Sequence, residues 1–290
     1  MKETDILRRF MFENLPVRGV FVHLDATWRA ICDRNTYPKE VADQLGQLVA
    51  AGMLLSSTLK FDGSMTLQIQ GSGPVNLMVV EATAARTVRA IARWQSEDFR
   101  GDLKKMFGDG NLVITIELAN GERYQGIVAL EGDSIAKVVE GYLRQSEQLD
   151  TRLWLAIDGD QATGMLLQKL PSEEGEETDD WNRLKQLANT IESSELKDLS
   201  AQEILHRLFH EDTLRLYDAE PISFRCSCTR DRVGNMLRSL GYGEIKSLLE
   251  ERGNIEVNCQ FCNQLYVYDA VDAEGLFAAS NSPDVPKTRH

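Results

Sequence analysis

The stretch that runs from Cys226-Ser-Cys228 to Cys259-Gln-Phe-Cys262 decides the fold of the C-terminal part of the chain. It holds four of the five cysteines in the sequence. A Cys-x-Cys pair and a Cys-x-x-Cys pair can each direct two thiolates at one point, and four thiolates form the tetrahedral set that Zn²⁺ prefers. The spacing therefore predicts that Cys226, Cys228, Cys259 and Cys262 bind one zinc ion, with no histidine ligand.

The residues around the second pair favour a hairpin. Residues 255–257 and 265–268 have the composition of strands, so Cys259 and Cys262 are expected on the turn between them, where backbone N–H groups can hydrogen-bond the sulfurs. A thioredoxin-like redox motif would instead lie beside a βαβ unit. Two interpretations of a zinc site stay open from the residues alone: an inert structural zinc ribbon, and a site that is itself a switch.

Composition and charge limit the class of protein. At 290 residues, with 42% hydrophobic residues, the chain has room for a main domain with a real core and a smaller second domain. The formal net charge is −13, and acidic and basic residues balance between Cys226 and Cys262. A nucleic-acid-binding zinc ribbon should be basic, so no nucleic-acid partner is expected at physiological salt.

The sequence also predicts where the protein works. Charged residues occupy the N-terminus where a signal peptide needs an apolar run, and no stretch approaches the roughly 20 apolar residues of a membrane span. We therefore expect a cytoplasmic protein without a membrane partner. In a reducing compartment, a cysteine cluster favours metal binding or redox sensing over a permanent disulfide framework.

Hydrophobic periodicity predicts an antiparallel α+β main domain over residues 1–171. Its strongest element is a helix over 38–60 whose apolar positions cover several faces, which indicates a central core helix. Other predicted helices are a short one around 28–32, one over 83–94 and one over 134–148 capped by Ser134; residues 98–110 are expected to form loops. Predicted strands are 20–24, 64–70, 75–80, 111–118, 124–130, 152–157 and 164–170. His23 is interpreted as a half-buried structural histidine and Cys32 as a small buried hydrophobe.

Residues 172–225 are predicted to be a helical linker between the core domain and the zinc domain of residues 226–290. The linker opens with an acidic tract over 172–180, continues with a polar helix over 181–199, and begins a second helix at a capping box of Ser200 and Glu203. That helix has a narrow apolar stripe, and its two histidines are expected on the surface. The stripe residues are Ile204, Leu205, Leu208 and Phe209, and the histidines are His206 and His210. We expect this linker to be the least stable ordered part of the chain.

The chain resembles the redox-regulated chaperone family called heat shock protein thirty-three, or 33 kDa chaperonin. The resemblance covers nearly the whole chain and is most specific at Phe224-Arg-Cys226-Ser-Cys228 and Val257-Asn-Cys259-Gln-Phe-Cys262-Asn. It also includes Val17-Arg-Gly19, Leu59-Lys-Phe-Asp-Gly-Ser64 and Leu67-Gln-Ile-Gln-Gly-Ser-Gly-Pro74. Cys32 inherits no role from the family, and neither the residues near 98–110 nor the acidic tract match a family motif.

The resemblance implies an ATP-independent holdase, which binds unfolding client proteins and is not an enzyme. In the family, the reduced zinc-bound form is inactive. Oxidation gives the disulfides Cys226–Cys228 and Cys259–Cys262, expels zinc, unfolds the linker and uncovers client-binding surface. Active members form homodimers and pass clients to the ATP-dependent seventy-kilodalton chaperone system. We take the stripe of Ile204, Leu205, Leu208 and Phe209 as the candidate client-binding residues.

The chemistry of the cysteines is consistent with such a switch. Thiolates, not thiols, react with oxidants, and a bound zinc ion keeps its cysteine ligands deprotonated. Zinc binding contributes on the order of 10 kcal/mol to the folding of a small domain. Two alternatives are a thiol–disulfide oxidoreductase with Cys259 as nucleophile and an interaction protein with an inert zinc ribbon. No catalytic or nucleotide-binding motif is present in the sequence.

Overall fold

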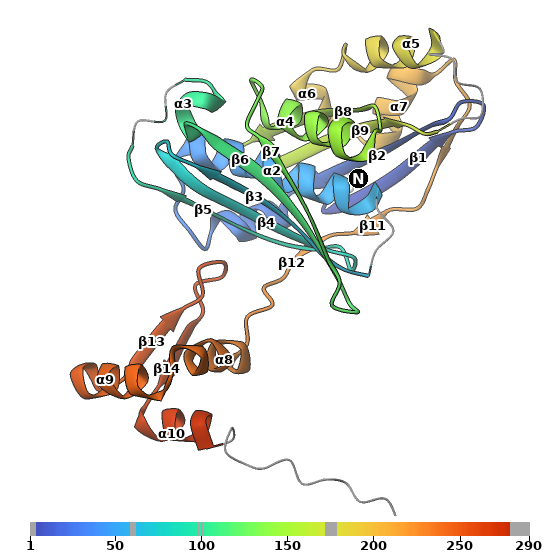
Figure 1. The fold of residues 1–290 in the computed structure, drawn as a ribbon. Coiled ribbons are helices and arrows are strands. Elements are labelled where there is room, and N and C mark those ends of the chain that lie inside the picture. The colour runs from blue at the N-terminus through green and yellow to red at the C-terminus, as the bar shows by residue number, and fades with distance from the viewer. Residues whose placement is uncertain (1–3, 59–61, 98, 100, 172–178, 279–290) are drawn as a thin grey trace, which may run out of the picture. The chain divides into compact units, whose positions relative to one another are not determined.

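Helix α2 (Lys39–Thr58) is the centre of the larger of two units. The computed structural model describes residues 4–58, 62–97, 99, 101–171 and 179–278. The first unit extends to Arg225 and the second begins at Cys226. Helix α2 packs against strands of two different β-sheets, so residues on several of its faces are buried, as the sequence predicts (Figure 1). Its buried residues include Leu45, Leu48 and Leu54, none of which has exposed surface.

Both sheets of the first unit are six-stranded and almost entirely antiparallel. The first sheet has the order β10 (Leu214–Leu216), β1 (Ile6–Phe12), β2 (Val17–Leu24), β9 (Gln161–Lys169) and β8 (Thr151–Asp158), with β11 (Glu220–Pro221) also on β1. The second has the order β12 (Ser223–Phe224), β5 (Thr87–Trp94), β4 (Val75–Thr83), β3 (Gly63–Gly71), β6 (Gly110–Leu118) and β7 (Arg123–Ala129). The predicted α+β class is therefore confirmed. The predicted strands 64–70 and 75–80 pair as the hairpin β3–β4, and the predicted strands 111–118 and 124–130 pair as the hairpin β6–β7.

The helices of the first unit cover the sheets and join their strands. Helix α4 begins at the predicted Ser134 cap, whose hydroxyl accepts the Lys137 N–H, and it continues into a π-helical turn (Leu143–Glu147). Besides α2, the helices before the linker are α1 (Ala26–Cys32), α3 (Leu103–Phe107) and α4 (Ile135–Tyr142). Those of the linker are α5 (Asp179–Ala188), α6 (Ser193–Asp198) and α7 (Ala201–Phe209).

The first sheet is buried on both faces. Along β2, Val20, Val22 and Leu24 pack into the cluster around α2, whereas Phe21 belongs to a second cluster that includes residues of α5, α6 and α7. Glycine is required at position 19 in β2, because a Cβ there would lie 2.0 Å from the Phe10 ring. Gly19 is part of the Val17-Arg-Gly19 motif.

The second unit is a small α+β module. It consists of α8 (Arg230–Leu240), α9 (Tyr242–Arg252), the hairpin of β13 (Ile255–Asn258) and β14 (Leu265–Tyr268), and α10 (Ala270–Ala278). The hairpin is the one predicted around the second cysteine pair. The three helices were not predicted. The buried hydrophobic core of the described part of this unit is six residues: Val233, Leu237, Ile245, Ile255, Tyr268 and Ala273.

Several sequence-based predictions are wrong. Residues 83–94 are not a helix: they finish β4 and form β5, in which Val88, Ala90 and Ala92 are buried at alternate positions. Pairing with β4 overrides the helical propensity of the alanines and arginines. Residues 98–110 contain the short helix α3, capped by the Asp102 side chain. His23 is fully buried, with an exposed fraction of 1%, rather than half-buried.

The linker also differs from its prediction. Residues 181–199 form two helices instead of one, because the chain leaves helical conformation after Ala188 and a new capping box at Glu192 and Glu195 starts α6. The capping box of Ser200 and Glu203 is present as predicted. Strands β1, β10, β11 and β12 were not predicted. Most of the acidic tract, residues 172–178, lies outside the described residues.

Candidate metal centre

The four cysteines of the second unit come from two separate turns. Cys226 and Cys228 lie just before α8, which is capped by the Thr229 side chain. Cys259 and Cys262 lie on the turn between β13 and β14.

Backbone hydrogen bonds close the hairpin turn around Cys259. Its N–H donates to the Gln264 carbonyl at 2.9 Å, and its carbonyl accepts from the Asn263 N–H at 2.7 Å. Asn263 has a φ of 57°, in the left-handed region that asparagine tolerates better than most residues. These bonds and the α8 cap fix the backbone that carries both cysteine pairs.

The two turns bring all four sulfurs together. Each Sγ lies within 4.8 Å of the other three. The Cys226 and Cys259 sulfurs are 3.6 Å apart, and the Cys228 and Cys262 sulfurs are 3.3 Å apart. A disulfide bond is about 2.05 Å long, so these are four separate thiols.

This donor set fits zinc. A tetrahedron of sulfurs with Zn–S bonds of about 2.3 Å has S–S edges of about 3.8 Å. The observed distances of 3.3 and 3.6 Å lie a little below that edge, and the limit of 4.8 Å lies above it. Among the described residues, these cysteines are the one cluster of three or more histidine, cysteine or acidic side chains close enough to hold a metal ion. The arrangement is therefore compatible with a zinc site formed by sulfur alone.

Tyr266 is a neighbour of the cysteine cluster that sequence reasoning missed. Its hydroxyl donates a hydrogen bond to the Cys228 sulfur at 3.2 Å. Tyr266 follows Cys262 on β14, and its side chain is half-buried in the module core. The alternation along Leu265-Tyr-Val-Tyr268 distinguishes two faces of this strand, but only the folded hairpin shows which face meets Cys228.

The surroundings of the cluster shift the pKa values of Cys228 and Cys262 in opposite directions. Burial opposes ionisation of Cys228, but hydrogen bonds from Tyr266 and then from the other cysteines outweigh it and lower the Cys228 pKa to about 7. Burial raises the pKa of Cys262 well above its usual range. Without a metal, negative charge therefore collects first on Cys228, the sulfur that holds the tyrosine hydrogen bond.

The other residues singled out from the sequence lie in the first unit. The stripe of Ile204, Leu205, Leu208 and Phe209 is buried against the first sheet, with exposed fractions of 1–5%. His206 on α7 and His210 directly after it are exposed, with ring centroids 6.1 Å apart. Cys32 is partly buried against the main core, and burial, assisted by Asp33 and Asp160, raises its pKa to about 12.

The fold and this cluster define a class: an α+β core unit joined to a small module with a four-cysteine centre. The family model described as Hsp33 protein matches residues 5–269. The chain is 47% identical to the 33 kDa chaperonin of Nitrosococcus oceani over all of both chains. It is 46% identical to that of Methylobacillus flagellatus, with 96% of each chain covered.

The fold is shared with a solved structure. A crystal structure of the 33 kDa chaperonin (heat shock protein 33 homolog) from Thermotoga maritima superposes with a TM-score of 0.81 at 22% identity, covering 95% of this chain and 99% of that one. The protein belongs to the Hsp33 family, which is a family of chaperones. Among the described helices, none is both long and apolar enough to cross a membrane.

Proposed function

We propose that this protein is an ATP-independent chaperone that oxidation switches on. One observation carries the proposal: four cysteine sulfurs lie within 4.8 Å of one another in a unit whose described residues, 226–278, include six in the buried core. A core of that size supplies little stability by itself, so the fold of the module depends on what the sulfurs bind. The family membership supports the chaperone activity.

In the reduced state, Cys226, Cys228, Cys259 and Cys262 would hold one zinc ion. When bound, the metal would keep these four cysteines deprotonated near neutral pH and would cross-link the α8 turn to the hairpin turn. The Tyr266 hydroxyl remains at the Cys228 sulfur, where it stabilises negative charge. Reduced protein is thus expected to be folded and inactive.

Oxidation would remove the four cysteines as metal ligands in pairs, because each disulfide takes up two of them. For each pair, two thiolates lose two electrons and form one S–S bond, while one peroxide takes up these electrons and two protons from solvent and is reduced to two waters. The family resemblance implies the pairs Cys226–Cys228 and Cys259–Cys262, and we propose them here; partners separated by one or two residues also stay close when the module unfolds. The shortest distances between sulfurs in the folded module instead join Cys226 to Cys259 and Cys228 to Cys262. Peptide mapping of the oxidised protein therefore tests this pairing directly.

Loss of the sulfur cluster would unfold the second unit and then release the linker. Residues of the linker helices, among them Ile204, Leu205, Leu208 and Phe209, are buried on the first sheet. Phe209 contacts Phe12 of β1 edge to face, with ring centroids 5.2 Å apart. Release would expose both this apolar stripe and the sheet surface beneath it, and we propose that unfolding client proteins bind there.

The remaining parts of the proposal rest on family resemblance. The active form would be a homodimer and would pass clients to the ATP-dependent seventy-kilodalton chaperone system. Reduced cysteines of this kind suit the cytoplasm.

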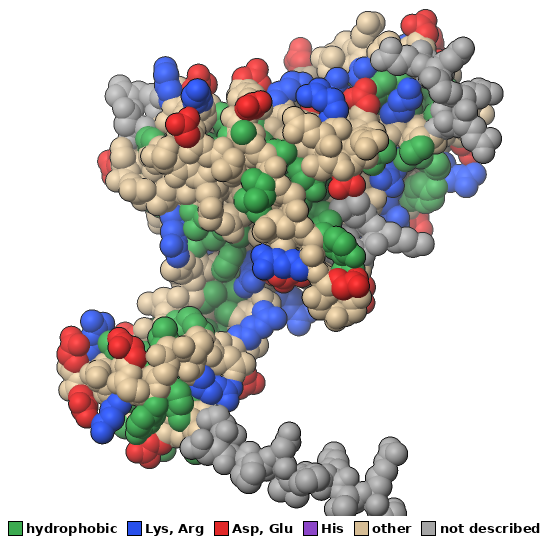
Figure 2. Space-filling view, viewed as in Figure 1, with side chains coloured by type: hydrophobic (Ala, Val, Ile, Leu, Met, Phe, Trp, Pro, Cys, Tyr) green, Lys and Arg blue, Asp and Glu red, His purple; other side chains and the backbone are tan. Residues whose placement is uncertain are grey.

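Acidic and basic side chains are interspersed on the face shown in Figure 2, and no nucleic-acid partner is proposed.

The test compares reduced and oxidised protein in one aggregation assay. A model protein is heated with each form while a chromogenic chelator follows zinc release. The expected result is one zinc released per chain and suppression of aggregation by the oxidised form alone. Equal suppression by both forms, or full zinc retention after peroxide with mild heat, would contradict the switch and favour an inert zinc ribbon. Catalytic turnover of small disulfides would favour an oxidoreductase.

A further inference from the structure

One short segment covers an edge of both sheets in the first unit. Residues 214–224, here called the edge strap, follow the linker helices and contain β10, β11 and β12. Strands β10 and β11 pair with β1, and β12 pairs with β5. Without the edge strap, β1 and β5 would be the terminal strands of their sheets.

At β5 the edge strap lies as an extended peptide would. The Ser223 N–H donates to the Arg86 carbonyl and the Arg225 N–H donates to the Val88 carbonyl, both at 3.1 Å. The side chain of Ile222 is 4% exposed and belongs to the main core. Two residues later, the Phe224 ring packs on the same core, with the Arg34 guanidinium 4.2 Å from its centroid. Backbone hydrogen bonds with alternate apolar anchors are the features of strand addition.

The cover on β5 is short. Strand β12 has two residues, whereas β5 has eight. Polar contacts account for much of the rest of the attachment of the edge strap. Glu220 forms ion pairs with Arg9 at 2.9 Å and with Arg86 at 2.7 Å. The Ile222 N–H donates to the Asp5 carbonyl at 2.8 Å. Parallel pairing over so few residues is a weak attachment.

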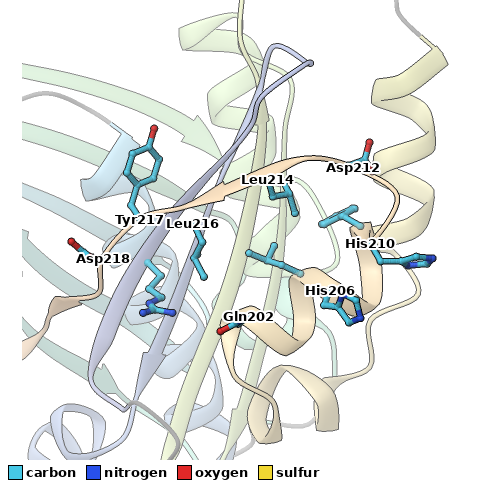
Figure 3. A pocket seen from close by; sticks show the side chains of 11 residues that line it. Gln202, His206, His210, Asp212, Leu214, Leu216, Tyr217 and Asp218 are labelled. Atoms are coloured by element: carbon cyan, nitrogen blue, oxygen red, sulfur yellow. The ribbon is translucent and has the colours of Figure 1, made fainter.

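The β10 end of the edge strap is incompletely packed. A pocket of about 450 Å³ separates it from α7, as Figure 3 shows. Its lining includes Gln202, His206 and Phe209 on the α7 side and Leu214, Leu216 and Tyr217 on the edge strap. At the other end, a single residue, Arg225, separates Phe224 from Cys226. Unfolding of the second unit would therefore act on the edge strap directly through the chain.

We propose that the edge strap occupies the edge of β5 in the reduced protein and leaves it after oxidation. The uncovered edge of β5 then binds an extended segment of unfolded polypeptide as an added strand. This inference rests on the proposed function and names a client site separate from the α7 stripe. The occupant follows from the geometry. The edge already holds a parallel strand, whereas two copies of β5 related by a two-fold axis would have to pair antiparallel. Recognition of backbone groups also suits clients of unrelated sequence.

Hydrogen exchange on full-length protein tests the site. The probe is reduced, carboxymethylated α-lactalbumin, which stays unfolded, and its binding is followed separately by size-exclusion chromatography. Oxidation is expected to speed exchange at least tenfold in residues 86–88, which lie next to β12, and bound probe is expected to slow exchange over residues 86–94 at least fivefold. Residues 123–129 of β7, the opposite edge of the same sheet, serve as the internal control and should not respond.

Each other outcome overturns the inference. Bound probe without protection of residues 86–94 would place clients elsewhere, while the proposed function would stand. Slower exchange of residues 86–94 that appears without probe and increases with protein concentration would show that a second copy of the chain binds the edge of β5. Failure of the oxidised protein to bind the probe would overturn both the proposed function and this site.

A covalent lock provides an independent test. Thr87 and Ser223 are partners in the parallel β12–β5 pair, so Thr87→Cys with Ser223→Cys should cross-link the edge strap to β5. The matched control, Glu117→Cys with Arg123→Cys, places the same cross-link between β6 and β7 and leaves the edge strap free. With both disulfides verified by peptide mapping, the oxidised locked protein should bind the probe at least tenfold more weakly than wild type. The oxidised control should stay within threefold, and equal binding by the locked variant would refute the site.

Discussion

The two units of this protein reach a folded state by different means. The first buries a large continuous cluster around α2 and a second cluster under the linker helices. In the part of the second that the structure describes, six core residues are buried and four sulfurs lie within 4.8 Å of one another. Burial of apolar surface does not depend on the redox state of cysteines. A cluster of four cysteine sulfurs is lost when these cysteines are oxidised to disulfides. An oxidant is therefore expected to act on the second unit while the first keeps its fold.

Removing one sulfur should have the largest effect. In Cys259→Ser the second unit should lose most of a metal-linked folding free energy on the order of 10 kcal/mol. Its amides, those of residues 230–278, should exchange at rates near those of an unfolded chain, while α2 stays protected. Metal analysis and hydrogen exchange measure both. Undiminished zinc affinity in this variant would rule out the proposed site.

A core truncation in the first unit should produce the reverse pattern. Trp28 of α1 has no exposed surface and donates its indole N–H to the Gly159 carbonyl at 2.9 Å. Trp28→Ala should cost about 3–5 kcal/mol of the free energy of unfolding. All four tryptophans lie in the first unit, so denaturant unfolding followed by the fluorescence of the other three reports on that unit alone.

Zinc affinity should not change in this variant. Arg29→Ala, at an exposed position of the same helix, is the control and should have little effect on stability. Loss of zinc from Trp28→Ala under native conditions would show that the two units do not fold independently.

The linker helices offer a sharper comparison, because they fold with the first unit yet are proposed to respond to the second. Leu208→Ala should weaken their attachment by about 2–5 kcal/mol and loosen residues 181–209 in the reduced protein. Partial client binding without oxidation should follow. Gln202→Ala, at an exposed position on the same helix, is the matched control. If the reduced Leu208→Ala protein exchanges like wild type in this segment, linker release is not limited by this packing.

Within the cysteine cluster, Tyr266→Phe should change acidity more than fold. Loss of the hydroxyl should move the Cys228 pKa upward from about 7 toward its ordinary value of 9.0. A lowered pKa stabilises the folded state above the ordinary pKa, and this contribution disappears as pH falls through about 7. The free energy of unfolding of the metal-free second unit, already small in wild type, should therefore be lower in Tyr266→Phe, by a difference that grows from pH 7 to pH 9. Thiolate absorbance near 240 nm follows the titration, and an unchanged curve would remove Tyr266 from the site.

Cys32 should give the smallest effect. Because burial and the nearby Asp33 and Asp160 raise its pKa to about 12, it stays a thiol at neutral pH and is a poor nucleophile. Cys32→Ser should leave zinc content and oxidative activation at wild-type levels. After zinc is removed with a chelator, alkylation at pH 8 should label the four cysteines of the second unit before Cys32. Faster labelling of Cys32 would show that the first unit opens more readily than its core indicates.

Sequence alone was sufficient where the deciding signals are local. The paired spacings of Cys226–Cys228 and Cys259–Cys262 identified a sulfur cluster, because short spacing limits where two thiols can point. The α2 helix and the hairpins were predictable from periodicity, since neighbours along the chain determine these elements. The cap at Ser134 and the capping box of Ser200 and Glu203 belong to the same class of local signal.

Only the tertiary structure decided the features that depend on distant partners. Residues 87–94 became a strand because β4 offers a hydrogen-bonding edge, and residues 214–224 became short strands because β1 and β5 do. The linker stripe looked thin in sequence but is buried on a sheet whose strands lie far from it in the chain. Tyr266 meets Cys228 across the folded module, 38 positions apart. Pairing and packing between distant segments depend on the whole fold. A local sequence pattern does not specify which distant strand or side chain a residue will contact.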